Sequence, residues 1–131
     1  SNFGMNETDM TKRLIRAIEN PFVDILGHPT GRLLMRRPEY ALNPSAVIDA
    51  AIANGVALEI NASPSRLDLG PDIVKHARDK GAMISINTDA HSAENLDYMW
   101  LGINVARRGW LNKENVINTF TINEFQEWKQ R

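Results

Sequence analysis

The sequence predicts an α/β fold in which about three parallel strands alternate with helices. Three short apolar runs, over 22–26, 56–60 and 82–87, lie between segments with the 3.6-residue spacing of amphipathic helices. Strands that alternate with helices favour parallel pairing and right-handed crossovers. Three parallel strands make neither a closed barrel nor a well-covered open sheet. The chain is therefore either a small and unusual fold or part of a larger barrel.

The first helix is predicted over residues 9–20. Its apolar side chains fall on one helical face: Met10, Leu14, Ala17 and Ile18. Asn20-Pro21 ends it, because the residue before a proline is disfavoured in the helical conformation. The strand over 22–26 follows and runs into Gly27-His28.

The second helix begins at Asn43-Pro44, which places asparagine at the N-cap and proline at the first helical position. Its predicted apolar face consists of Val47, Ile48, Ala51 and Ile52. Gly55 ends the helix as a left-handed cap, and the strand over 56–60 leads to Asn61.

Pro71 opens a third helix, which stops at Gly81 before the strand over 82–87. Its inward residues are Ile73, Val74 and Ala77. The rest of the chain is predicted to be helical, first over 95–108 and then over 112–118. The longer helix carries a set of large apolar residues on one side: Leu96, Met99, Trp100, Ile103 and Ala106.

Gly109 is expected to end that longer helix, and a capping box at Thr121 and Glu124 opens the last one. The tryptophans are expected to be anchors in a core or an interface: Trp100, Trp110 and Trp128.

Composition limits the classes of protein. The chain has 131 residues, of which 43% are apolar and 24% charged, which places it among globular proteins with a single core. The net charge of -1 argues against tight nucleic-acid binding by this segment alone. No apolar run approaches the ~18 residues of a membrane span. The absence of cysteine excludes a disulfide frame and a thiolate metal site, and is compatible with a cytoplasmic location.

Asp89 and His91 are two residues apart after the last predicted strand. On an extended backbone, residues at this spacing point to the same side. A carboxylate and an imidazole that leave a strand together suit a divalent metal with oxygen and nitrogen ligands. The alternative is a turn in which Asp89 caps the next segment and His91 is merely exposed.

His28 lies between two glycines at the end of the first strand, with Arg32 close by. An imidazole suits a metal, and a guanidinium fork suits a phosphate. The alternative is a loop histidine beside a solvated arginine.

In the middle strand, Glu59 alternates with apolar residues, so it is expected to point into the same interior as Asn61. A buried glutamate needs a partner, which Arg66 or Arg32 could supply, either in a structural salt bridge or in catalysis.

Six sequence blocks resemble the C-terminal half of a PHP (polymerase and histidinol phosphatase) domain, of the kind fused to bacterial family X DNA polymerases. They are MTKR from Met10, DILGHPTGR from Asp24, EINA from Glu59, RLDL from Arg66, TDAH from Thr88 and ARRGWL from Ala106. This resemblance covers nearly the whole chain, and the GHPTGR and TDAH blocks together are specific.

The resemblance implies a distorted seven-stranded (β/α) barrel, of which residues 1–131 would be the C-terminal part. Its strand ends hold up to three divalent metals, often manganese or zinc. The implied chemistry is phosphoester hydrolysis, which in family X polymerases is a 3'-5' exonuclease and 3'-end-processing activity on DNA. The matching metal ligands are His28, Asp89 and His91, with Arg32, Glu59 and Asn61 as candidate catalytic residues.

One departure separates the chain from the complete domain. The H-x-H block and further ligands of the family are absent, and the only other histidine, His76, is off the motif. The chain, which starts at Ser1 rather than Met, is thus expected to be an inactive fragment that self-associates through its open edge. Two alternatives remain, a stand-alone phosphatase of the histidinol-phosphate type and a structural module without activity.

Overall fold

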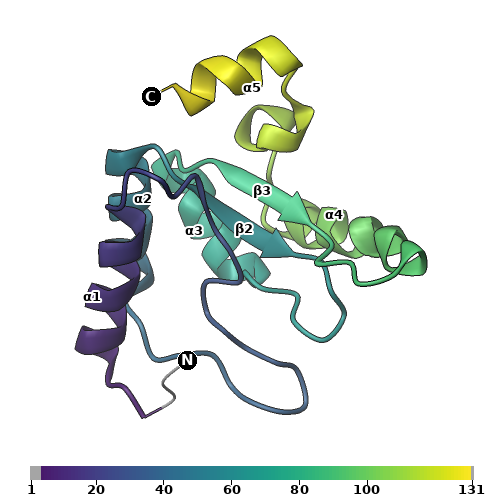
Figure 1. The fold of residues 1–131 in the computed structure, drawn as a ribbon. Coiled ribbons are helices and arrows are strands. Elements are labelled where there is room, and N and C mark those ends of the chain that lie inside the picture. Colours follow the sequence, from purple (N-terminus) through teal and green to yellow (C-terminus); the bar gives the residue numbers. More distant parts are fainter. Residues whose placement is uncertain (1–3, 131) are drawn as a thin grey trace.

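The computed structural model describes residues 4–130 and contains a parallel sheet and five α-helices (Figure 1). The strands are β1 (Ile25–Leu26), β2 (Ala57–Asn61) and β3 (Ile84–Asn87). The α-helices are α1 (Glu7–Ile18), α2 (Pro44–Asn54), α3 (Pro71–Lys80), α4 (Met99–Arg108) and α5 (Ile122–Lys129). Three 3-10 helices complete the chain, η1 (Ala93–Tyr98), η2 (Lys113–Asn115) and η3 (Ile117–Thr119).

The sheet has the order β1-β2-β3, and both pairings are parallel, as predicted. Leu26 pairs with Leu58, and Leu58 pairs in turn with Ile84. At the carboxyl end, Asn61 of β2 lies opposite Asn87 of β3. The residues that follow the three strands therefore leave the sheet at the same end, which is where parallel α/β folds place their ligands.

The two faces of the sheet differ in chemistry. One face is apolar and packs against α2, α3 and α4, which lie together on that side (Figure 1). Its residues are Leu58, Ile60, Ile84 and Ile86, all buried. Gly102 permits α4 to approach closely, because a Cβ there would lie 2.5 Å from the side chain of Ile86. Alternation along the strands turns Glu59, Asn61, Ser85 and Asn87 to the opposite face.

The C-terminal segment lies over this second, polar face. An open pocket of about 380 Å³ separates the two, lined by Ile25, Ser85 and Asn87 from the sheet and by residues of the 117–125 segment. Lys129, at the end of α5, reaches Asp24 just before β1, with an Nζ to Oδ2 distance of 3.4 Å. The sheet is thus covered by a full helical layer on one side and by a single short helix on the other.

The outer edge of β3 is covered by the chain itself. The side-chain amide of Asn118 donates to the carbonyl of Ile86 at 2.7 Å and accepts from its N–H at 2.8 Å. Val116 forms a parallel bridge with Ile84. A strand edge whose backbone groups are occupied cannot template pairing with another chain. Among the described residues, the edge of β1 remains the unpaired one.

The predicted starts and stops of α2 and α3, the stop of α4 and the start of the last helix are confirmed, whereas α1 spans Glu7–Ile18 rather than 9–20 and ends before Asn20-Pro21. Asn43 caps α2 by accepting from the N–H of Ala46, and Gly55 and Gly81 end α2 and α3 with left-handed φ angles of 65° and 91°. Gly109 is the C-cap of α4, and the capping box of Thr121 is present. No helix in the described part of the chain is both long and apolar enough to cross a bilayer.

Three further expectations on secondary structure were wrong in extent. The first strand is two residues long rather than five, because Val23 N–H bonds to the carbonyl of Asn20 and keeps the chain in a turn. The helix over 95–108 divides into η1 and α4, and the helix over 112–118 into two 3-10 turns. Four residues of the predicted apolar faces are more than a third exposed: Ile52, Leu96, Trp100 and Ile103. Trp110, expected as an anchor in a core or an interface, is 63% exposed.

Candidate functional site

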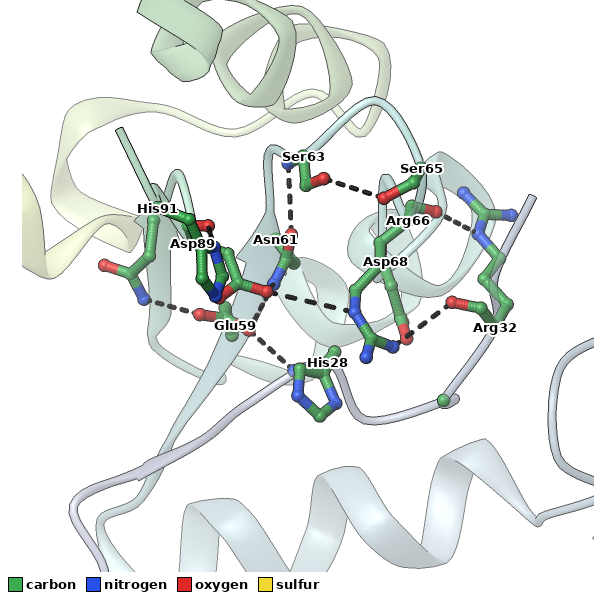
Figure 2. A network of polar contacts seen from close by, with 12 residues as sticks. His28, Arg32, Glu59, Asn61, Ser63, Ser65, Arg66, Asp68, Asp89 and His91 are labelled. Carbon is green, nitrogen blue, oxygen red and sulfur yellow. Dashed lines mark hydrogen bonds and ion pairs between the residues drawn. The ribbon is translucent and has the colours of Figure 1, made fainter. Parts of the chain in front are cut away.

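Glu59 is the centre of a polar cluster at the carboxyl end of the sheet (Figure 2). Its Oε2 accepts from the backbone N–H of His28 at 2.6 Å and lies 3.4 Å from Nδ2 of Asn61. Its Oε1 accepts from Nδ2 of Asn87 at 2.9 Å. Glu59 is 8% exposed, so these donors supply the hydrogen bonds that a buried carboxylate requires.

The expectation that Glu59 and Asn61 face the same interior is confirmed, but the expected partner of Glu59 was wrong. Neither Arg66 nor Arg32 contacts it, and two amides and a backbone N–H take their place. Their guanidinium groups instead donate to carbonyls of the loops that follow β1 and β2.

Asn61 links the cluster to Asp89. Its Nδ2 donates to Asp89 Oδ2 at 3.0 Å, while its Oδ1 accepts from the N–H of Ser63 at 3.0 Å. Arg66 Nε also lies 3.9 Å from Asp89 Oδ2. Both contacts of the Asp89 carboxylate use Oδ2, so Oδ1 has no hydrogen-bond partner within residues 4–130. A carboxylate that is oriented through one oxygen leaves the other available to a ligand.

The geometric reason for pairing Asp89 with His91 was wrong. Strand β3 ends at Asn87, and Asp89 has a left-handed φ of 55°, so the two residues do not extend the strand. They are connected in a different way, since Nδ1 of His91 lies 2.7 Å from the backbone carbonyl of Asp89. A carbonyl can only accept, so Nδ1 carries a proton. In the neutral ring this leaves the lone pair on Nε2, a common arrangement in metal-binding histidines.

His28 enters the cluster through its backbone rather than its ring. Its N–H is bound to Glu59, its φ is 27°, and the imidazole projects away from Glu59 (Figure 2). Neither ring nitrogen has a hydrogen-bond partner in the described part of the chain. The side chain is exposed, and its ring is not committed to other contacts.

Arg32 and Arg66 clamp the loops after β1 and β2 to each other. Nε of Arg32 donates to the carbonyl of Arg66 at 2.7 Å, and its Nη2 donates to the carbonyl of Leu67. In return, Nη1 of Arg66 donates to the carbonyl of Arg32 at 3.3 Å. Arg32 was expected to bind a phosphate, but its Nε and Nη2 donors hold the loop. Arg66 lies beside Asp89.

Asp68 fixes the loop that carries His28. Its two carboxylate oxygens lie 3.2 and 3.1 Å from the backbone N–H of Thr30, and the side chain is fully buried. Burial raises the pKa of the Asp68 carboxyl, and hydrogen bonding from Thr30 and the charge of Arg32 partly oppose this rise. The loop position of His28 is thus set from two sides, by Glu59 and by Asp68.

The predicted metal ligands have suitable donor atoms but do not form a complete site. Within residues 4–130, no three His, Asp or Glu side chains lie together in a group that could hold a metal ion. The structure brings Asp89 and His91 into direct contact and joins His28 to the same cluster through Glu59. A complete coordination shell would need further ligands in addition to these residues.

Sequence reasoning missed two members of the site. Asn87 supplies a donor to Glu59, and its signal was the alternation that places it two residues before Asp89 on the polar face. Asp68 belongs to the RLDL block, but no role was predicted for its side chain. Its contact with Thr30 spans 38 positions of sequence. No local periodicity predicts a pairing between two loops at that separation.

The sequence is similar to those of a DNA polymerase/3'-5' exonuclease and of probable phosphatases. It is 40% identical over 131 residues, its whole length, to the DNA polymerase/3'-5' exonuclease PolX of Bacillus subtilis, of which it covers 23%. It is 32% identical over 129 residues to a probable phosphatase of Thermoanaerobacter sp., with 92% of this chain and 50% of that protein aligned. No protein-family model matches the chain. The chain spans about a quarter of PolX and half of that phosphatase.

Proposed function

We propose that this chain is the C-terminal part of a metal-dependent PHP phosphoesterase domain, a partial (β/α) barrel within a bacterial family X DNA polymerase. In the parent protein this domain would be a cytoplasmic 3'-5' exonuclease that processes DNA 3' ends. The similarity to PolX over the entire chain supports this reading, since the named activities of that relative include a 3'-5' exonuclease.

The observation that carries the proposal is the hydrogen-bonded chain from His28 through Glu59 and Asn61 to Asp89. It gathers the ends of all three parallel strands into one cluster, as a phosphoesterase site in a barrel requires. The donor types, two imidazoles and carboxylates, suit manganese or zinc.

We assign His28, Asp89 and His91 as metal ligands, to be completed by residues outside this chain. A divalent metal bound there would supply a lowered pKa for a coordinated water and charge stabilisation for a phosphate. Glu59 and Asn61 act as positioning residues, because they hold the His28 backbone and the Asp89 carboxylate. Arg66, beside Asp89, is better placed to meet an anion than Arg32.

A second candidate function is hydrolysis of a small phosphomonoester such as histidinol phosphate. The similarity to the Thermoanaerobacter phosphatase favours it. The two candidates share the metal ligands and differ in substrate size. DNA binding outside the site therefore discriminates between them.

Metal binding tests the assignment directly. Mn²⁺ binding to this chain is measured by electron paramagnetic resonance of the free ion, in wild type and in the His28→Ala, Asp89→Ala and His91→Ala variants. Each substitution should weaken binding. The control is His76→Ala, since Nε2 of His76 lies 3.1 Å from the Ser45 hydroxyl, between α3 and α2. Equal loss in the control would contradict the ligand set.

Activity is tested in a chimera in which this chain replaces its matching segment in Bacillus subtilis PolX. We expect Mn²⁺-dependent removal of nucleotides from a labelled DNA 3' end. Asp89→Ala should abolish this activity, and His76→Ala should leave it intact. An active chimera that is insensitive to Asp89→Ala would refute the proposed role of this residue.

A further inference from the structure

The positive charges of the chain are unevenly distributed, although the net charge is only -1. Six cations make ion pairs with carboxylates: Arg32, Arg66, Lys75, Arg78, Lys80 and Lys129. Among the cations with no ion pair within residues 4–130, Arg107, Arg108 and Lys113 lie at the end of α4 and just after it. Four others lie on α1 and in the loop after β1: Lys12, Arg13, Arg16 and Arg36. We call these four residues the basic surface.

Three members of the basic surface come from one side of α1. The opposite side of that helix is buried through Met10 and Ile18. Lys12, Arg13 and Arg16 are exposed and line a common surface hollow, together with Met5 and one carboxylate, Asp9. Positions three and four apart lie on the same face of a helix, so the three cations form a stripe that Asp9 shares and in which positive charge is in excess.

The fourth member joins the stripe through Met5. This residue lines the hollow beside Arg13 and also lines a second hollow beside Arg36 and Arg37. The connection is fixed farther along, because the N–H of Asn43 donates to Oγ1 of Thr11 at 2.9 Å. The stripe on α1 and the loop after β1 therefore form one surface.

That surface leads toward the candidate site. Nε of Arg37 donates to the carbonyl of Gly31 at 2.8 Å, in the same tight loop as His28. Gly31 itself bonds through its N–H to the carbonyl of His28 at 3.0 Å. A ligand that follows the cations from α1 along the loop would arrive at the cluster of Glu59 and Asp89.

We propose that the basic surface binds the phosphate backbone of a DNA strand and directs its 3' end into the candidate site. The choice of DNA as the polyanion rests on the proposed function, and the location of the surface rests on the geometry. Arginine and lysine side chains that lack carboxylate partners contact phosphates without reading bases. Binding should therefore be independent of sequence and should weaken steeply with salt.

The test is fluorescence anisotropy of a labelled single-stranded thymidine oligonucleotide of about twelve nucleotides, a length within the usual site sizes. EDTA is included to prevent hydrolysis, and salt is varied from about 50 to about 200 mM. The test variant is Arg13→Gln/Arg16→Gln. The matched control is Arg107→Gln/Arg108→Gln, two exposed arginines in the last turn of α4 with no ion pair in the described chain.

The control lies at the far end of the helical layer, since α1 packs on α2, α2 on α3 and α3 on α4 (Figure 1). Each lost phosphate contact should flatten the slope of log affinity against log salt by ~0.7. The test variant should thus flatten it by about 1.4, and the control should leave it unchanged. Arg36→Gln, outside any helix, should flatten the slope by about 0.7 and serves if the α1 variant fails to fold.

Equal flattening by the test and control pairs would overturn the proposal, as would an absence of salt-dependent binding. Association with phosphatidylglycerol vesicles but not with the oligonucleotide would assign the surface to membranes instead. Mn²⁺ binding separates this proposal from the proposed function. If Asp89→Ala leaves Mn²⁺ binding unchanged while the arginine variants flatten the slope, the DNA surface stands and the metal site does not.

Discussion

The backbone N–H of His28 donates to Oε2 of Glu59 across 2.6 Å, and this bond joins the loop after β1 to the interior of β2. The two residues are 31 positions apart in sequence. The bond holds a left-handed residue in place, since His28 has a φ of 27°. A non-glycine residue in this conformation needs support from its surroundings. Glu59 provides this support and couples the loop to Asn61 and Asp89.

Replacement of Glu59 by Gln should therefore destabilise the chain. Glutamine presents one acceptor where the glutamate presents two, and its amide would face donors from His28, Asn61 or Asn87. We expect the free energy of unfolding to fall by about 2 kcal/mol, the usual cost of losing a buried hydrogen bond to a charged group. Urea denaturation followed by circular dichroism measures it. Glu127→Gln, an exposed change on α5, should have little effect. A neutral result for Glu59→Gln would mean that the carboxylate does not support the loop.

Asn61→Ala should weaken Mn²⁺ binding without removing a ligand. Its Nδ2 orients Asp89 through a 3.0 Å hydrogen bond, and loss of an orienting partner typically costs about tenfold or more in metal affinity. The measurement is a Mn²⁺ titration by paramagnetic resonance. Asn104→Ala, at an exposed position of α4, is the matched control. Unchanged affinity in the Asn61 variant would show that Asp89 is oriented without it.

The stability of the chain should depend on pH through Asp68. Burial raises the pKa of this carboxyl in the folded state above its ordinary value of 3.8. The folded state then binds more protons than the unfolded state, so the contribution of Asp68 is fully present below pH 3.8 and is lost as the pH rises through the folded pKa. Asp68→Asn removes this loss.

The free energy of unfolding of the Asn variant, relative to wild type, should accordingly increase from about pH 4 to pH 7. Urea titrations across that range measure the difference. The matched control is Asp97→Asn, a change at an exposed position of η1. If the Asp68→Asn difference stays flat, the carboxyl titrates as it does in the unfolded chain.

The strand interior was predictable, and the loops were not. Alternation alone placed Glu59 and Asn61 on one face, because a strand has a fixed period of two. Asp89 was expected to continue the strand, with its side chain pointing to the same side as that of His91. Its left-handed φ of 55° turns the chain instead, and the two residues meet where Nδ1 of His91 contacts the carbonyl of Asp89. The partner of Asp68, 38 residues away, depends on how two loops pack, which no local pattern encodes.

The isolated chain should not hydrolyse phosphodiesters at an appreciable rate. No group of three or more potential ligands forms within residues 4–130, so any bound metal would keep most of its coordination positions for water. We expect no turnover of a nitrophenyl phosphodiester or of single-stranded DNA with Mn²⁺. Chelator-sensitive turnover that disappears in Asp89→Ala would overturn the fragment interpretation.

The chain should also self-associate, and the structure indicates through which surface. The edge of β1 was expected to drive pairing, but the strand is only two residues long, and a very short edge strand offers few free backbone groups. A more extended apolar surface runs along η1 and α4, where Leu96, Trp100 and Ile103 are 61%, 60% and 41% exposed. Trp100 and Ile103 are three residues apart and lie on one face of α4, and Leu96 precedes them in η1. Exposed apolar stripes of this kind favour association.

Light scattering at micromolar concentration should therefore report a mass above that of the monomer. Trp100→Lys should shift the population toward monomer, because it places a charge in the middle of the stripe. Phe22→Lys, which changes a side chain 91% exposed beside the β1 edge, should have a smaller effect. The reverse order of the two variants would assign association to the strand edge. A monomer over a wide concentration range would show that three strands and their helices suffice for an independent fold.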